Sequence, residues 1–199
     1  MALFDSLKKL VGSQLKRETA NAVQQAIQSA GRGSNPSETF TFTALPATLE
    51  ELRALPEASL DSPYKTAALA LVALCRYEAD EATAWEMLDF LKGPENLSNM
   101  EKQFLRERLA GKGYKCLSFF AGATPDNGYT PTTPYRLTVS ANPYSFQTEH
   151  WATMFVTSGG ADDPRPIKLR QKPSTGQWFL NEVQCLSDIR LPKEQDPWA

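Results

Sequence analysis

The histidine and the cysteines are the residues of this 199-residue chain that could most readily support acid–base, nucleophilic or metal chemistry. His150 is the only histidine, and a Cys-His pair would need Cys116 or Cys185 to meet it in space. The three cysteines, the third being Cys75, are odd in number and never spaced as C-x-x-C, which argues against a disulfide framework and against a zinc site of the usual kind. We therefore expect no metal site. For His150, at the start of an apolar run, a structural role is favoured over a catalytic one.

Common motifs for phosphate or dinucleotide binding and for nucleophilic catalysis are missing from the sequence. It contains no G-x-x-x-x-G-K-[ST] phosphate loop, no G-x-G-x-x-G after a strand and no G-x-S-x-G nucleophile elbow. Asp126-Asn-Gly and Asp162-Asp163 match only fragments of a calcium loop and are interpreted as turns. We expect no cofactor, and the sequence favours a protein without catalytic activity while leaving an enzyme open.

Charge and hydropathy limit the classes of partner. The formal net charge is −2, from 21 basic and 23 acidic residues, so the chain has no overall positive field for nucleic acid and we expect none to bind. A basic row is interpreted as the solvated face of a strand in preference to an anion-binding surface: Arg165, Lys168, Arg170 and Lys172. No secretory signal or stretch of 18 apolar residues is found, and unpaired cysteines fit a cytoplasmic protein.

Residues 1–33 have the pattern of one amphipathic helix. Apolar residues recur at steps of three and four up to about Ala30, and Gly31, Gly33 and Pro36 then end the pattern. The segment holds five basic and two acidic residues, a net charge of +3, which leaves −5 for the rest of the chain. Its large apolar residues are the candidates for contact with a partner: Leu3, Phe4, Leu7, Leu10, Val11 and Leu15. Contact with a protein partner, self-association, docking on its own domain and binding to a membrane surface all remain open.

Four helices are predicted between residues 48 and 111 from their start and stop signals. Thr48 and Glu51 form a capping-box pattern, and Ser62-Pro63 opens the most apolar helix of the chain, which should lie centrally. Asp80 should cap the next helix, which ends at Gly93-Pro94. Ser98 with Glu101 opens the last helix, whose apolar residues are Met100, Phe104, Leu105 and Leu109.

The last third of the chain, from Tyr135, has the pattern of an antiparallel meander. Strands are predicted from residue 135, over 150–157, over 166–171 and over 177–183, separated by turn-forming segments. Phe40 and Phe42 alternate with threonines, which predicts a further strand at the edge of the same sheet. The fold class is therefore α+β: a helical half packed on a C-terminal antiparallel sheet. The domain organisation is a separate amphipathic helix at 1–33 and a single domain at 34–199.

Four segments, mostly in turns and in the tail, are unusually specific. They are Gly122–Pro131, Asn142–Ser145, Gly159–Ile167 and the tail Ser187–Ala199, which reads SDIRLPKEQDPWA. From about Leu45 onward the chain resembles an uncharacterised bacterial family, built around a domain of unknown function, whose members end in a similar Asp-Ile-Arg-x-Pro-Lys and Asp-Pro-Trp tail. The resemblance implies no activity, cofactor or partner. We expect Trp198 to pack against the helices, and Asp188 or Arg190 to fix the tail by a side-chain contact.

Two classes of function are consistent with these observations. The first is a non-enzymatic binding protein that contacts its partner, or another copy, through residues 1–33. The second is a small-ligand binder or enzyme with a pocket between helices and sheet, as in the cone-shaped folds of the nuclear-transport-factor-like superfamily. The pocket would be lined by His150, Trp151, Tyr129, Tyr135 and Tyr144.

Overall fold

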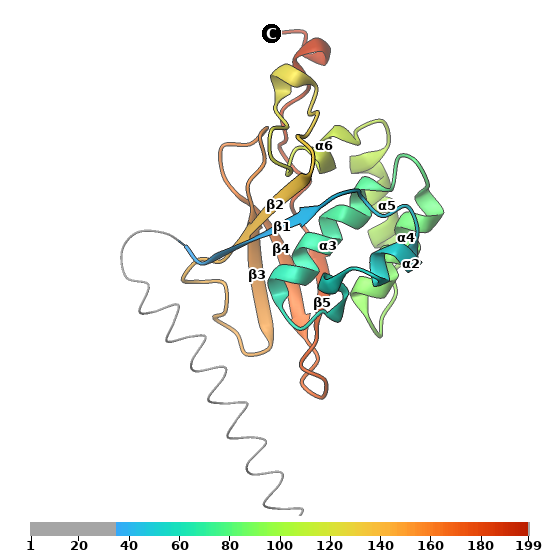
Figure 1. Ribbon diagram of the computed structural model, residues 1–199, viewed down its shortest axis with the longest axis vertical. Coiled ribbons are helices and arrows are strands. Elements are labelled where there is room, and N and C mark those ends of the chain that lie inside the picture. The colour runs from blue at the N-terminus through green and yellow to red at the C-terminus, as the bar shows by residue number, and fades with distance from the viewer. Residues whose placement is uncertain (1–34, 199) are drawn as a thin grey trace, which may run out of the picture. The chain divides into compact units, whose positions relative to one another are not determined.

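The computed structural model describes residues 35–198, which form five α-helices and a five-stranded antiparallel sheet (Figure 1). The predicted α+β class is confirmed. By the packing of its backbone the chain divides into Met1–Pro36 and Ser37–Ala199. The predicted helix at 1–33, with its candidate contact residues, lies outside the described residues.

The sheet follows the order of its strands in the chain. These are β1 (Ser37–Phe42), β2 (Tyr135–Ser140), β3 (Trp151–Val156), β4 (Arg165–Gln171) and β5 (Trp178–Val183), each antiparallel to its neighbours. The predicted edge strand is confirmed, since β1 pairs with β2 from Ser37↔Ser140 to Phe42↔Tyr135. Pairing of β2 with β3 is brief, because Thr153 N instead donates to Ser145 O in the connecting loop.

Alternation along the strands gives the sheet two unlike faces. Phe40, Phe42, Leu137, Val139, Met154, Val156, Ile167 and Leu169 are buried on the face toward the helices. Trp151, Thr153 and Phe155 occupy the alternate positions of β3 and are only partly buried. Because side chains alternate between faces with a period of two, these three residues face away from the helical layer.

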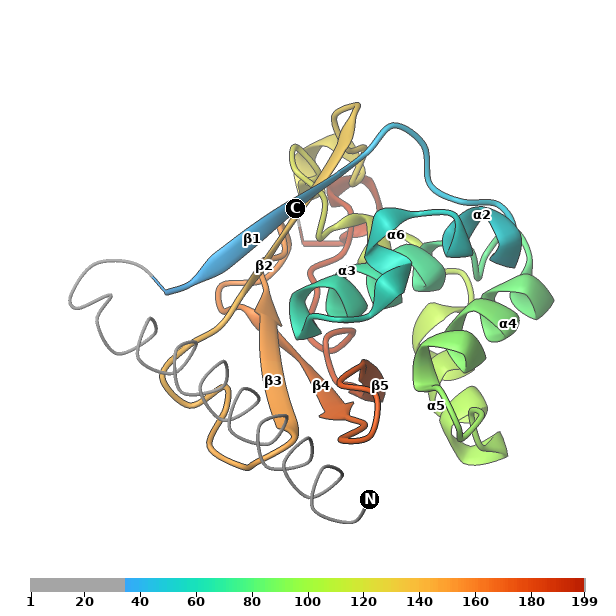
Figure 2. The ribbon, with the colours of Figure 1, turned by 60° about the horizontal axis from the view of Figure 1, so that its bottom comes forward.

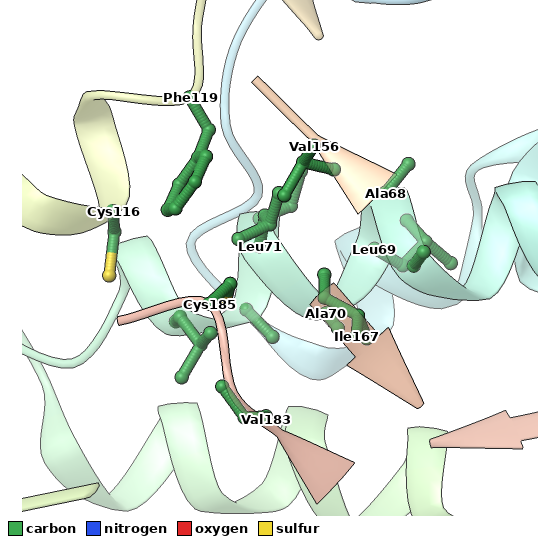
Figure 3. Close-up of a cluster of buried hydrophobic side chains, with 14 of the residues drawn as sticks. Ala68, Leu69, Ala70, Leu71, Cys116, Phe119, Val156, Ile167, Val183 and Cys185 are labelled. Atoms are coloured by element: carbon green, nitrogen blue, oxygen red, sulfur yellow. The ribbon is translucent and has the colours of Figure 1, made fainter. Parts of the chain in front are cut away.

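Helix α3 (Pro63–Cys75) lies across the inner face of the sheet (Figure 2). Ser62 caps it by accepting from Tyr64 N at 3.3 Å, and Pro63 takes the first helical position. Ten of its thirteen residues are buried, as the pattern predicted for a central helix. Figure 3 shows Leu69 and Leu71 packed among side chains from β3, β4 and the end of β5. Each large side chain buried here stabilises the fold by about 1.5–3 kcal/mol.

The remaining helices surround α3 and the free edge of the sheet. They are α2 (Leu49–Arg53), the 3-10 turn η1 (Pro56–Ser59), α4 (Glu81–Lys92), α5 (Asn99–Leu109) and α6 (Tyr114–Leu117). Asp80 caps α4, and Ser98 with Glu101 forms the predicted capping box of α5. At α2 the predicted box is altered, because Glu51 accepts from Ala47 N instead of from Thr48 N. Helices α4 and α5 lie beside β5 in both ribbon views (Figures 1 and 2).

Strand β5 lies at the edge of the sheet, and some backbone groups along its free side are bonded to other segments. Trp178 N donates to Leu60 O at 2.7 Å, and Thr66 Oγ1 donates to Trp178 O at 2.8 Å. Asn181 has no partner in the register with β4, where Lys168 faces Glu182 and Leu169 faces Leu180, so it forms a β-bulge. An edge that is bulged and bonded to helices is a poor template for pairing with another strand.

The tail makes the predicted side-chain contact at Arg190, but it does not make the predicted contact at Trp198. Nη2 of Arg190 donates to both carboxylate oxygens of Asp162, and the Arg190 carbonyl accepts from Tyr129 Oη at 2.8 Å. Beyond η3 (Lys193–Gln195), Trp198 is 93% exposed. The prediction that Trp198 packs against the helices is therefore wrong: the tail is fixed by polar contacts upstream of its aromatic residue.

Candidate functional site

His150 and Trp151 lie at the start of β3 and point to different surroundings. His150 has φ +63°, and its Nδ1 donates to Gln171 Oε1 at 3.0 Å. Its Nε2 lies 3.5 Å from the exposed carboxylate of Glu149. Trp151 faces away from the helices, and the guanidinium of Arg170 lies 5.3 Å from its ring centroid. These are cross-strand contacts typical of a sheet surface.

The three tyrosines of the predicted pocket are also separated. Tyr129 is fully buried and stacks on Tyr114 at a centroid distance of 5.4 Å. Tyr135 contacts Phe120 edge-on, whereas Tyr144 is 70% exposed. The structure therefore does not bring the five predicted pocket residues together, and none of them lines either of two hollows that lie beside β5.

The three cysteines, distant in sequence, come together, with Cys116 and Cys185 buried in the core and Cys75 partly buried against it. Cys75 ends α3, Cys116 lies on α6 and Cys185 follows β5, and Figure 3 shows the last two among apolar side chains. A hydrogen bond with the Cys75 thiol and complete burial raise the pKa of Cys116 well above its usual value. Burial and the neighbouring Cys116 raise the pKa of Cys185 as well. Thiols held in the protonated form are poor nucleophiles, so Cys116 and Cys185 have the character of core packing.

A groove of about 190 Å³ lies between α5 and β5. Its walls, which define the α5–β5 groove, are Lys92, Leu97, Met100, Glu101, Phe104, Leu105, Leu180, Asn181, Glu182 and Val183. Leu97, Leu105, Leu180 and Val183 are buried and form its floor, whereas Met100 is 80% exposed and Phe104 38%. A cavity of about 150 Å³ is enough to hold one benzene molecule, so the groove has room for one large apolar side chain.

Lys92, at the end of α4, and Glu101, in the first turn of α5, form an ion pair in the lining of the groove. The lysine side chain is 10% exposed and also lies 3.5 Å from Asn181 O, on the bulge of β5. Burial alone would raise the pKa of Glu101, but hydrogen bonds from Lys92 and Ser98 hold it below its usual value. The Glu101 carboxylate is therefore ionised at neutral pH and paired with Lys92, in a groove whose other lining is largely apolar.

A second, more open hollow of about 540 Å³ lies between α2, α4 and the start of β5. This α2–α4 hollow is lined by Leu49, Arg53, Leu60, Glu86, Asp89, Phe90, Gly93, Asn96, Gln177 and Phe179. The guanidinium of Arg53 lies 4.9 Å from the ring centroid of Phe90. The volume is that of a small-ligand pocket, and its lining mixes aromatic, acidic and amide groups.

The two hollows meet at the contact between Gly93 and Phe179. Lys92 and Leu180, the next residues along each chain segment, line the α5–β5 groove. A Cβ at residue 93 would lie 2.3 Å from Cδ1 of Phe179, so only glycine allows the ring to pack against the end of α4. This contact sets the distance between α4 and β5, and hence the shape of both hollows.

Residues 44–193 match the model of a family described as a domain of unknown function, DUF6935. The chain belongs to this family. No curated protein and no solved structure matches it. The DUF6935 domain thus includes both hollows, the cysteine cluster and most of the polar contacts of the tail, while residues 1–43 lie before the match.

Residues 35–198 contain no group of three histidine, cysteine or acidic side chains placed to hold a metal ion. Nor does any helix in this part of the chain have the length and apolarity needed to cross a bilayer. The clearest candidate sites of the DUF6935 domain are accordingly the two hollows, which sequence reasoning missed because each is built from three separate elements.

Proposed function

We propose that the protein is a non-enzymatic binding protein whose main contact element is residues 1–33. One observation carries the proposal: the large apolar residues of this segment recur at helical spacing, and its net charge of +3 is opposite to the −5 of the rest. The segment also lies before the DUF6935 match, as expected for an addition to a self-contained domain.

The sequence of the segment suits a protein surface better than a lipid surface. Its apolar side chains are large up to Leu15 and are largely alanines beyond residue 20. Alanine contributes little area for insertion into lipid, whereas large residues at i, i+4 and i+7, as in Leu3, Leu7 and Leu10, are the anchors of helix-in-groove recognition. The partner class is therefore a protein with an apolar groove and acidic flanks, or another copy of this chain.

The test is deletion of residues 1–33 in the native cell, with affinity capture by the full chain and by the shortened chain. Partners that bind through the segment should be lost on deletion, while the melting temperature of residues 34–199 stays the same. A matched control keeps the segment and replaces Leu7 and Leu10 with serine, which removes the apolar stripe but not the charge. Loss of no partner in either variant, with unchanged oligomeric state, would contradict the proposal. Binding of the full chain to anionic vesicles would point to a membrane surface instead.

The α2–α4 hollow favours a second candidate, a small-ligand binder. Its volume of about 540 Å³ falls in the range of about 300–1,000 Å³ that is typical of ligand sites. A small molecule bound there should raise the melting temperature of the wild type, and Arg53→Ala should reduce that rise by removing the only guanidinium in its lining. A screen of metabolites that gives no shift would count against this candidate.

A further inference from the structure

The α2–α4 hollow carries charged groups of both signs in its lining. Arg53 ends α2, whereas Glu86 and Asp89 lie three residues apart on α4, so the two carboxylates share one face of that helix. Within residues 35–198 none of these three side chains forms an ion pair. Charged groups that are not paired within the chain can pair with a ligand that brings the opposite charges.

The opposite charges lie near each other without pairing. The guanidinium of Arg53 lies 4.9 Å from the ring centroid of Phe90, which follows Asp89 and lies one helical turn after Glu86. Asp89 Oδ1 accepts from Leu97 N at 2.7 Å, and no hydrogen bond within the described part of the chain reaches Oδ2. A cation and two carboxylates therefore lie beside the same stretch of α4. An α-amino acid has the matching arrangement, because its ammonium and its carboxylate are attached to one carbon.

The rest of the hollow suits an apolar side chain. Phe179 packs against Gly93, where a Cβ would lie 2.3 Å from Cδ1 of its ring, so this aromatic wall is fixed. The apolar residues of the lining are Leu49, Leu60, Phe90 and Phe179. The volume of about 540 Å³ has room for a small organic molecule that contacts these residues and the charged groups together.

The charges also select against ligands of a single sign. With one guanidinium and two carboxylates in the lining, a simple anion would meet net repulsion. A simple cation would leave the guanidinium of Arg53 without a partner. A ligand with both charges pairs with each wall and is repelled by neither.

We propose that the α2–α4 hollow binds a free α-amino acid with an apolar side chain. Arg53 pairs with the ligand carboxylate, and Glu86 with Oδ2 of Asp89 accepts from its ammonium. The apolar side chain of the ligand packs against Phe90 and Phe179. This inference rests on the second function proposed above, the small-ligand binder, and does not depend on residues 1–33.

The test is a two-dimensional NMR titration of the isotope-labelled full chain with L-phenylalanine and with two analogues that each lack one charge. The analogues are 3-phenylpropionate, which has no ammonium, and 2-phenylethylamine, which has no carboxylate. The wild type should bind L-phenylalanine with a Kd below roughly 1 mM, with shifts at the residues that line the hollow. Each analogue should bind at least tenfold more weakly, because one charged hydrogen-bonded pair is lost.

Two variants assign each charge of the ligand to its partner. Arg53→Ala should weaken binding of L-phenylalanine at least tenfold and leave binding of 2-phenylethylamine unchanged. Glu86→Gln should weaken binding of L-phenylalanine and leave binding of 3-phenylpropionate no weaker than in the wild type. Unchanged binding of the matching analogue also verifies that each variant is folded. The matched controls are Arg136→Ala and Glu95→Gln, which remove exposed charges outside the hollow and should change none of these affinities.

Three results would overturn the inference: no binding of L-phenylalanine at the hollow, analogues that bind as tightly as the amino acid, or full affinity in both variants. Another metabolite could instead raise the melting temperature in a way that depends on Arg53. In that case the ligand class is wrong, while the small-ligand function stands. If neither the amino acid nor any metabolite binds, both fail.

Discussion

Replacement of Gly93 by alanine tests the contact on which both hollows depend. Gly93 has φ +76° and ψ −119°, a conformation that glycine adopts and other residues do not. Forcing an alanine into it costs about 1–3 kcal/mol. The new Cβ would lie 2.3 Å from Cδ1 and 2.6 Å from Cε1 of Phe179, so the ring must move and its packing against α4 is lost. Overpacking of this kind costs a further 1–3 kcal/mol or so.

The expected loss is therefore about 2–6 kcal/mol, a large part of the roughly 5–15 kcal/mol by which a domain of this size is stable. Urea unfolding followed by circular dichroism measures it, with the slope of the transition as a check that the unfolded state is unchanged. Gly111→Ala is the matched control, because Gly111 has φ +67° but no atom within 4 Å of an added Cβ. It incurs only the backbone cost, about 1–2 kcal/mol.

A double-mutant cycle separates the two costs. Phe179→Leu shortens the side chain that the new Cβ would strike, so Gly93→Ala should be less damaging by about 1–2 kcal/mol in that background. The cycle measures the interaction between residues 93 and 179, and not the backbone cost of an alanine at the end of α4. Equal losses for Gly93→Ala and Gly111→Ala, together with additive effects in the cycle, would refute the view that the Phe179 ring positions α4 on β5.

Three further predictions concern the groove, the cysteines and the tail. Glu101→Gln removes the carboxylate that pairs with the nearly buried Lys92, so it should lower the free energy of unfolding by about 1–3 kcal/mol after solvent screening. The loss should exceed that of Lys92→Met, which leaves a carboxylate that is 38% exposed. The reverse order in urea unfolding would contradict the ion-pair geometry. Because burial raises the pKa of Cys185 above its unfolded value of about 8.5, its stabilising contribution is complete below that pH and falls above it by about 1.4 kcal/mol per pH unit. Cys185→Ala should accordingly flatten the decline in the free energy of unfolding between about pH 9 and 10.5, and an unchanged slope would show that this thiol is not buried. Tyr129→Phe removes the hydrogen bond to Arg190 O and should cost about 1–2 kcal/mol, with faster proteolysis of the tail as the diagnostic; a tail cleaved at the wild-type rate would count against that anchor.

Local signals predicted most of the secondary structure. Ser62, Asp80 and Ser98 each accept a backbone N–H at the start of the helix expected of them, because capping depends on residues within one turn. The strands of the C-terminal meander and their order were also predictable, since alternation identifies a strand and short connections place β2 to β5 side by side. Helix capping and strand alternation both depend on residues that are close in sequence.

Contacts between distant segments were not predictable in the same way. The cysteines were interpreted as scattered, yet the packing of α6 against α3 brings Cys116 to Cys75. The strand predicted over 177–183 is observed as β5, but its bulge at Asn181 depends on the register with β4 and was not predicted. Trp198 was expected to be buried for its size, but the polar contacts of Arg190 decide the path of the tail. Each outcome depends on a partner that lies far away in sequence.

Helix α5 carries a signal in its sequence that would have revealed the groove. The helix has four predicted apolar residues, and at about 100° per residue Met100 and Phe104 lie roughly 140° from Leu105 and Leu109. One helix face cannot bury both pairs against the same layer. The structure buries Leu105 and Leu109 and leaves Met100 and Phe104 beside β5. The second pair is covered unequally: the guanidinium of Arg108 lies 3.4 Å from the ring centroid of Phe104, which is 38% exposed, whereas Met100 is 80% exposed.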